Sequence, residues 1–169
     1  MRPINIITAI LLILGVAQIA WGEEAKGTER FQAVGKNIVY DSQTELMWAV
    51  RDNGKDVDWY DADNYCKDFE AGGYSDWRLP DVKELATLYT KGTKNKDGYF
   101  IIDLIKITDC CMWSADTNMG GAEIFSFKSG KKPVGFLADT YQLRALPVRT
   151  NKKMNAGEYD VVDIRAKIK

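Results

Sequence analysis

The segment from Gly72 to Leu85 constrains the fold of this chain more than any other stretch of the sequence. It reads Gly-Gly-Tyr-Ser-Asp-Trp-Arg-Leu-Pro-Asp-Val-Lys-Glu-Leu. The glycine pair can adopt left-handed backbone angles and end a preceding helix, and Pro80 favours an extended conformation in the residue before it. Asp81 then predicts a helix N-cap, and Glu84, three residues later, completes a capping box. The run therefore indicates a helix end, a short extended piece that holds a Trp-Arg pair, and a new helix.

Short apolar runs bounded by turn residues predict strands on both sides of this segment. They cover Phe31 to Ala33, Ile38 to Tyr40, Leu46 to Val50, Cys111 to Ser114, Ala122 to Lys128, Pro133 to Leu137 and Tyr141 to Arg149. The 3.6-residue period predicts two helices. The first is capped by Asp58 and has Trp59, Ala62, Cys66 and Phe69 on one face; the second runs from Asp81 to Thr90 with Val82, Leu85, Ala86 and Tyr89 inward. The pattern indicates one α+β domain, with two helices packed on a small, irregular and mostly antiparallel sheet.

The N-terminal segment has the pattern of an export signal. Arg2 supplies the positive start, residues 6–17 are almost wholly apolar, and Ala20-Trp21-Gly22 places small residues at both cleavage positions. The apolar core is too short for a comfortable membrane span, although an uncleaved anchor is the alternative. We expect a signal peptide over residues 1–22, a flexible lead over 23–30 and one domain over 31–150. The protein is then exported to the periplasm, the cell surface or the extracellular space.

A charged extension follows over residues 151–169. In it Val162, Ile164, Ala166 and Ile168 alternate with Asp163, Arg165, Lys167 and Lys169. Strict alternation gives a strand one apolar and one charged face. Such a strand would pair with this domain's own sheet or with the open edge of a partner, so residues 158–169 are candidates for oligomerisation. A frayed terminus is the alternative.

The composition excludes several function classes. The formal net charge is −1, which leaves no general footprint for nucleic acid. The chain has no histidine, and this absence excludes Ser-His-Asp and Cys-His catalysis and the commonest zinc ligand sets. Of the three cysteines, Cys66 is expected to form a disulfide with Cys110 or Cys111 in an oxidising compartment. Three reduced, buried cysteines are the alternative.

Two groups of lysines form the candidate ligand-binding surface. Lys91, Lys94 and Lys96 lie in a basic loop whose composition predicts mobility, and Lys128, Lys131 and Lys132 lie at a predicted hairpin. Sulfated or carboxylated polysaccharides would be attracted to them by screened, salt-sensitive electrostatics. Lysines that are merely solvated are the ordinary alternative.

Two other clusters are interpreted as structural. Trp48, Trp59, Trp77 and Trp113 offer ring faces that suit sugars, but their strand and helix positions favour the core. Arg78 is expected to be a buried structural cation that needs either a ring face or a carboxylate partner, for which Asp76 and Asp41 are the candidates. The acidic group consists of Asp56, Asp58, Asp61, Asp63 and Asn64. Such a group of oxygen ligands could indicate a calcium site. A capped helix start with solvated carboxylates accounts for it better. No metal or other cofactor is therefore expected, and a structural calcium ion is unsupported.

Several motifs occur in an order that resembles one family of bacterial envelope domains. They are Phe31, the Asp41 to Ala49 run, Trp59 with Ala62 and Tyr65-Cys66, Trp77-Arg78-Leu79-Pro80, Trp113-Ser114, Phe125 to Gly130, and Arg144 to Arg149. Together they resemble the Lcl C-terminal-domain family, named after the end domain of collagen-like adhesins. The resemblance covers roughly residues 31–150. It implies a C-type-lectin-like fold, similar to the formylglycine-generating superfamily, in which Trp48, Trp59, Trp77, Arg78, Leu79, Pro80, Trp113 and Arg149 are structural.

The chain departs from the family pattern in three ways. Pro147 stands where many members have a cysteine, and the family domain usually ends soon after the last arginine. The formylglycine-generating relatives hold copper through two cysteines a few residues apart, a spacing absent here.

The resemblance implies a fold and a location more than a reaction, and from all these features we expect an exported, non-catalytic recognition or adhesion module of the bacterial envelope that binds polysaccharide or another surface protein. It would bind no nucleic acid and have no membrane span once the signal is cleaved. A structural subunit that assembles through its C-terminal strand and a divergent copper-dependent oxygenase are the alternatives.

Overall fold

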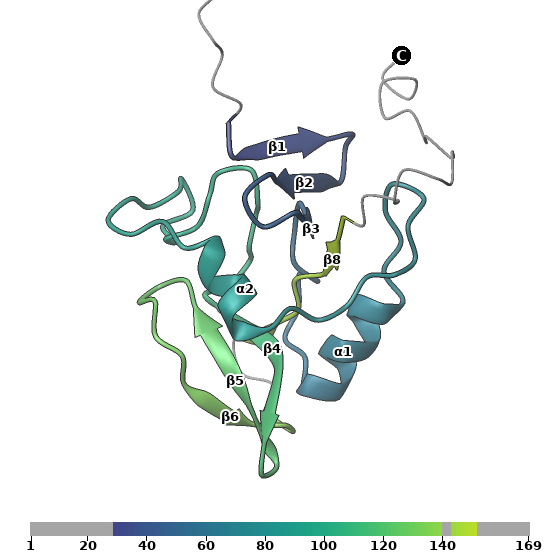
Figure 1. The fold of residues 1–169 in the computed structure, drawn as a ribbon. Helices are drawn as coiled ribbons and strands as arrows, with labels where there is room; N and C mark the ends of the chain where they lie inside the picture. The colour runs from purple at the N-terminus through teal and green to yellow at the C-terminus, as the bar shows by residue number, and fades with distance from the viewer. Residues whose placement is uncertain (1–28, 140–142, 152–169) are drawn as a thin grey trace, which may run out of the picture.

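The computed structural model describes residues 29–139 and 143–151, which form two helices and eight strands (Figure 1). The predicted signal peptide and tail strand lie outside these ranges. The first sheet has the order β1-β2-β3-β8 and the second β6-β5-β4-β7. The strands are β1 (Phe31–Val34), β2 (Ile38–Asp41), β3 (Leu46–Ala49), β4 (Cys111–Asn118), β5 (Gly121–Ser126), β6 (Val134–Phe136), β7 (Leu143–Arg144) and β8 (Val148–Thr150). Their pairing is antiparallel except between β4 and β7, so the predicted α+β class is confirmed.

Both helices begin where the sequence predicts. Asp58 caps α1 (Trp59–Lys67) by accepting a 2.8 Å hydrogen bond from the Asp61 N–H. Asp81 caps α2 (Val82–Thr87), and the Glu84 carboxylate accepts from the Asp81 N–H in return at 2.8 Å. The capping box satisfies backbone donors that have no partner within the helix. α2 stops at Thr87 rather than at Thr90, because the chain beyond it turns to bridge the segment that follows the basic loop.

The predicted single strand from Tyr141 to Arg149 is wrong in one respect. Among the described residues this run holds two strands in different sheets: β7 pairs with β4, and β8 pairs with β3. Between them the chain crosses from one sheet to the other, and Ala145 and Leu146 are fully buried during the crossing. The run is apolar because it passes through the core, and burial alone cannot distinguish one strand from two.

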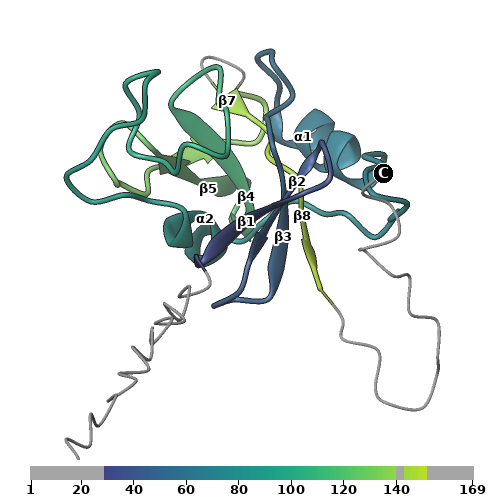
Figure 2. The same ribbon diagram turned by 90° about the horizontal axis from the view of Figure 1, so that it is seen from above.

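The core lies where the two sheets and the helices meet. α1 and α2 lie on opposite sides of β3 and β8 (Figure 2). One cluster places Trp48 against α2 and the inner residues of β4 and β5, and a second places Trp113 beneath α1. Gly72 has φ +64°, and a Cβ there would lie 2.5 Å from Ile38 Cδ1. Glycine is therefore required at this position both by the backbone angle and by the close approach.

Within the described ranges no helix has the length and apolar character needed to cross a membrane.

Candidate functional site

The basic loop after α2 is organised around one buried side chain, Asn95. Its Oδ1 accepts hydrogen bonds from the N–H groups of Asp97 and Tyr99, both at 3.0 Å. The Asn95 N–H donates to the Tyr99 carbonyl at 2.8 Å, and the Thr90 N–H donates to the Phe100 carbonyl at 3.1 Å. The composition predicts a mobile loop, whereas the structure shows one closed by its own hydrogen bonds. An asparagine between two turn glycines was the available signal, since Asn side chains commonly bond to nearby backbone amides.

The second lysine group lies on the tight turn between β5 and β6. The Gly130 N–H donates to the Ser126 carbonyl at 2.7 Å. Gly130 has φ +70°, and a Cβ there would lie 2.9 Å from Cζ of Tyr89, so the turn rests directly on that ring. The Phe100 N–H donates to the Phe127 carbonyl at 2.8 Å. The two predicted groups are therefore brought side by side on a shared aromatic base.

We call the six lysines on these two segments the lysine surface. They are Lys91, Lys94, Lys96, Lys128, Lys131 and Lys132, and all are exposed. The Lys94 ammonium lies 5.2 Å from the centroid of the Phe100 ring, a cation–π contact that links the charge to the aromatic base. Asp97 is the acidic residue within this loop. The arrangement presents concentrated positive charge on two segments whose backbones are fixed relative to each other.

The tryptophans do not form a platform for sugar rings. Trp48 and Trp113 are fully buried and Trp77 is 3% exposed. The indole N–H of Trp113 donates to the Val57 carbonyl at 3.0 Å, and that of Trp59 to the Ser114 carbonyl at 2.8 Å. Leu79 and Pro80 of the Trp-Arg-Leu-Pro run are buried as well. These side chains position the elements and leave little ring surface for a ligand.

Arg78 takes a different partner from either of those predicted. It forms a bidentate pair with Glu84, with N–O distances of 2.7 and 2.6 Å, and this hydrogen bonding raises the pKa of Arg78. Its side chain is 42% exposed rather than buried. The capping box already holds the Glu84 carboxylate at the start of α2, within reach of the Arg78 guanidinium. One glutamate therefore serves both the helix start and the guanidinium.

The two aspartates predicted for Arg78 are bound by other arginines. Asp76 pairs with Arg149 at 2.6 and 3.2 Å, and Arg149 also stacks on Tyr74 with its Cζ 3.8 Å from the ring centroid. Asp41 pairs with Arg30 at 2.8 and 2.7 Å. Burial acts to raise the pKa of Asp41, but its hydrogen bonds, that from Arg30 foremost, leave this pKa lower than usual.

The acidic group at the start of α1 is divided among separate partners. Asp58 is the cap, Asp63 pairs with Lys67 at 2.6 Å, and Asp56 pairs with Arg144. Calcium binding needs several oxygens that converge on one point. In the part of the chain that the structure describes, no three His, Cys, Asp or Glu side chains are placed to hold a metal ion.

The expected disulfide from Cys66 is wrong. The bond joins the adjacent Cys110 and Cys111, and Cys66 is free and fully buried on the inner face of α1. Cys66 packs with apolar residues that include Trp113 and Leu143. Burial raises the pKa of its thiol, as expected for a group whose charged form is poorly solvated. A copper site of the kind expected for the oxygenase alternative needs two free thiols close together, and the described cysteines do not fit it, because two are joined to each other and the third is buried apart from them.

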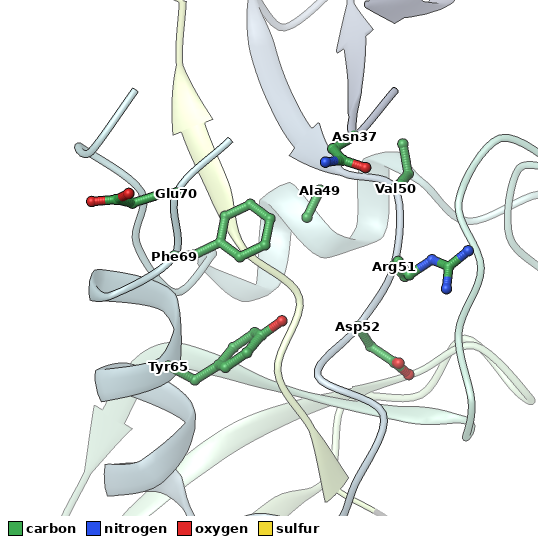
Figure 3. Close-up of a pocket in the computed structure, with 8 residues that line it drawn as sticks. All are labelled: Asn37, Ala49, Val50, Arg51, Asp52, Tyr65, Phe69 and Glu70. Carbon is green, nitrogen blue, oxygen red and sulfur yellow. The ribbon is translucent and has the colours of Figure 1, made fainter. Parts of the chain in front are cut away.

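A small pocket opens between α1 and the chain that leaves β3 (Figure 3). It has a volume of about 190 Å³ and is lined by Asn37, Ala49, Val50, Arg51, Asp52, Tyr65, Phe69 and Glu70. Asp52 accepts hydrogen bonds from the N–H groups of Thr108 at 2.6 Å and Gly54 at 3.0 Å, so this carboxylate is occupied with holding loops together. Ligand pockets usually measure about 300–1,000 Å³. This one is smaller, and α1 lies on the opposite side of the domain from the β5–β6 turn (Figure 1).

The fold and these contacts define a small α+β domain with a tryptophan-rich core, paired arginines and exposed lysine loops. The chain belongs to the Lcl C-terminal domain family, whose model matches residues 37–149. The matched range includes the Trp-Arg-Leu-Pro run, the cysteines and the lysine surface. Comparison with curated proteins gives no match.

Proposed function

We propose that this protein is an exported recognition module whose lysine surface binds sulfated or carboxylated polysaccharide. The observation that carries the proposal is the joining of the two lysine segments through Tyr89, Phe100 and Phe127. Two loops that are distant in sequence are thereby fixed as one basic face. Membership of the Lcl C-terminal domain family supports a role in surface recognition.

The physical basis of the proposed binding is that a polyanionic ligand contacts several lysine ammonium groups at once. Each exposed pair contributes little on its own, about 0–1 kcal/mol. Several lysines on fixed backbone positions act together, because less conformational freedom is lost when a ligand binds to segments that are already ordered. Asn95 supplies that order in one loop, and the contact between Tyr89 and Gly130 supplies it in the other.

Export and a non-catalytic role belong to the same proposal. The N-terminal residues 1–22 have the pattern of a signal peptide, and a disulfide between Cys110 and Cys111 suits an oxidising compartment. Against catalysis, the chain lacks histidine, and its free thiol is buried with a raised pKa. Thiolates are the reactive form of cysteine, so such a thiol is inert.

The test measures binding of the full chain to immobilised dextran sulfate, with uncharged dextran as the reference. Two triple variants are compared, K91A/K94A/K96A and K128A/K131A/K132A. Each should weaken binding about tenfold or more, equivalent to ~1.4 kcal/mol, and raised salt should weaken binding by the original chain.

The matched control is K36A/K55A/K83A, which removes three exposed lysines outside the lysine surface. It should bind as the original chain does. Equal losses in all three variants would show only a general charge effect. That result, or no binding of dextran sulfate at low salt, would refute the proposal.

A further inference from the structure

The most exposed large apolar side chains of the described residues lie at one end of the second sheet. Met119 is 103% exposed, Phe136 76% and Val134 66%. We call these three residues the apolar tip. Met119 lies in the β4–β5 turn, and Phe136 is paired with Gly121 just after that turn. Figure 1 shows this turn at the end of the domain farthest from β1.

The geometry of β6 directs Val134 and Phe136 away from the core. Alternate residues of a strand face opposite sides of the sheet. A Cβ at Gly135 would lie 2.6 Å from Ile124 Cδ1 and 3.1 Å from the Trp113 ring, so this position faces inward. Val134 and Phe136, on either side of it, therefore face solvent. Scattered single apolar residues on a surface are ordinary, whereas neighbouring ones mark interaction sites.

The turn holds Met119 outward at a conformational cost. Met119 has φ +43°, in the left-handed region that favours glycine. A residue with a side chain there costs about 1–2 kcal/mol. Asn or Gly would relieve the cost and is the usual choice in such a turn. The strained residue lies at the position where its side chain is most exposed, which fits a role in contacting a partner.

Acidic residues flank Met119 and Phe136, whereas Lys131 and Lys132 of the lysine surface precede Val134 along the chain. Asp116 and Glu123 flank the β4–β5 turn, and the stretch from Ala115 to Glu123 contains no lysine or arginine. Asp139 follows β6, and its carboxylate accepts from the Phe136 N–H at 2.9 Å. A partner that fits this surface combines apolar side chains with positive charge.

The backbone edge of β6 is partly blocked, which favours contact through side chains. The Asp139 N–H donates to the Phe136 carbonyl at 2.9 Å, so both outward backbone groups of Phe136 are already paired. Short, capped edge strands of this kind resist the addition of another strand.

The C-terminal segment of this chain has the complementary chemistry. Over residues 164–169 the apolar Ile164, Ala166 and Ile168 alternate with the cations Arg165, Lys167 and Lys169, and the acidic Asp160 and Asp163 precede this basic stretch. We propose that the apolar tip binds the C-terminal segment of a second copy of the chain, so that copies join head to tail. This inference is independent of the lysine surface and of polysaccharide binding.

The position of β8 favours a second copy over the same copy. The Asn151 N–H donates to the Glu45 carbonyl, so the described chain ends beside the β2–β3 turn, in the first sheet. The apolar tip lies at the far end of the second sheet (Figure 1). Residues 152–161 span at most about 35 Å when fully extended. A domain of this size is itself ~35 Å across, and a path over its surface is longer. Contacts between different surfaces of successive copies continue into chains.

The test uses complementary variants of the full chain, expressed with its own N-terminal segment. The tip variant carries Met119→Ser and Phe136→Ser, and the tail variant carries Ile164→Ser and Ile168→Ser. Sedimentation equilibrium should show concentration-dependent oligomers for the original chain and monomers for each variant alone. An equimolar mixture should form a one-to-one dimer and stop there, because only one intact tip and one intact tail remain.

Leu104→Ser is the control, since Leu104 is 41% exposed and lies outside the apolar tip; it should assemble as the original chain does. Because Phe136→Ser could affect folding, Met119→Ser alone is measured too, and it should weaken assembly with an unchanged unfolding midpoint. An original chain that is monomeric at all concentrations would overturn the proposal. Variants that keep the original mass, or a mixture that stays monomeric, would do the same.

Discussion

Arg149 in the first sheet and the six lysines of the lysine surface use the same charge in opposite ways. Arg149 is 5% exposed, stacks on Tyr74 and pairs with Asp76. The six lysines are exposed and lie on loops whose backbones, rather than their side chains, are fixed. A planar guanidinium fits a bidentate carboxylate and a ring face, whereas an ammonium on a flexible stem stays hydrated. The difference indicates that the arginines hold the domain together and leaves the lysines available for a ligand.

The largest expected effect is a loss of stability when the pair between Arg149 and Asp76 is broken. Asp76→Ala leaves the buried Arg149 guanidinium without its carboxylate, and should lower the free energy of unfolding by about 3 kcal/mol. Urea unfolding measures the change. Asp103→Ala, at an exposed position, is the control and should have almost no effect. If the two variants were equally stable, Arg149 would not depend on its pair.

The second prediction concerns the turn before the Trp-Arg-Leu-Pro run. Gly72→Ala should lower the free energy of unfolding by about 2–3 kcal/mol, because its Cβ meets Ile38 in addition to the positive φ. Gly35 has a similar φ of +61° with nothing within 4 Å of a Cβ. Gly35→Ala should therefore lower the free energy of unfolding by only about 1 kcal/mol, because the positive φ alone is unfavourable there. If both variants lost the same stability, the Ile38 side chain would have to move away from the new Cβ without a cost in free energy.

The third prediction tests whether an ordered backbone matters to the lysine surface. Asn95→Ala removes no charge but leaves the Asp97 and Tyr99 amides without their shared acceptor. This loss should lower the free energy of unfolding by about 1–2 kcal/mol. Dextran sulfate binding should weaken several-fold, with Thr93→Ala as the control. Unchanged binding would show that loop order does not contribute.

The fourth prediction follows the pKa of Asp41. This pKa is lowered in the folded state, so its contribution to stability is complete above the ordinary value of 3.8 and is lost as pH falls through the lower, folded value. The free energy of unfolding should fall in that acidic range. Asp41→Asn should show a shallower fall when unfolding is measured from pH 6 to pH 2. If the original chain and Asp41→Asn had the same dependence of stability on pH, groups other than Asp41 would account for the loss of stability in acid.

The smallest expected effect is on the stability of the lysine variants. K91A/K94A/K96A should unfold within about 0.5 kcal/mol of the original chain, as exposed charges usually do. If the free energy of unfolding fell by several kcal/mol, the lysines would stabilise the fold as Arg149 does, and the contrast between the two groups would be wrong.

Local signals predicted the helix starts because they depend on residues close in sequence. The Asp81–Glu84 capping box lies within one turn, and the structure contains it. The partner of Arg78 was misjudged because three carboxylates were available and only folding decides which arginine reaches which. The sequence predicts a bond from Cys66 because an oxidising compartment favours paired cysteines, whereas α1 buries Cys66 among apolar residues and the bond joins Cys110 to Cys111.

The sequence by itself determined the class of fold, the helix caps and the family, because hydrophobic period, turn glycines and capping residues act over a few positions. Only the tertiary structure decided that Tyr141 to Arg149 divides between two sheets, that Asn95 orders the basic loop, and that the two lysine groups meet over Tyr89. These features depend on contacts between residues far apart in the chain. Such contacts form only when the core brings the segments together, and no local pattern records them.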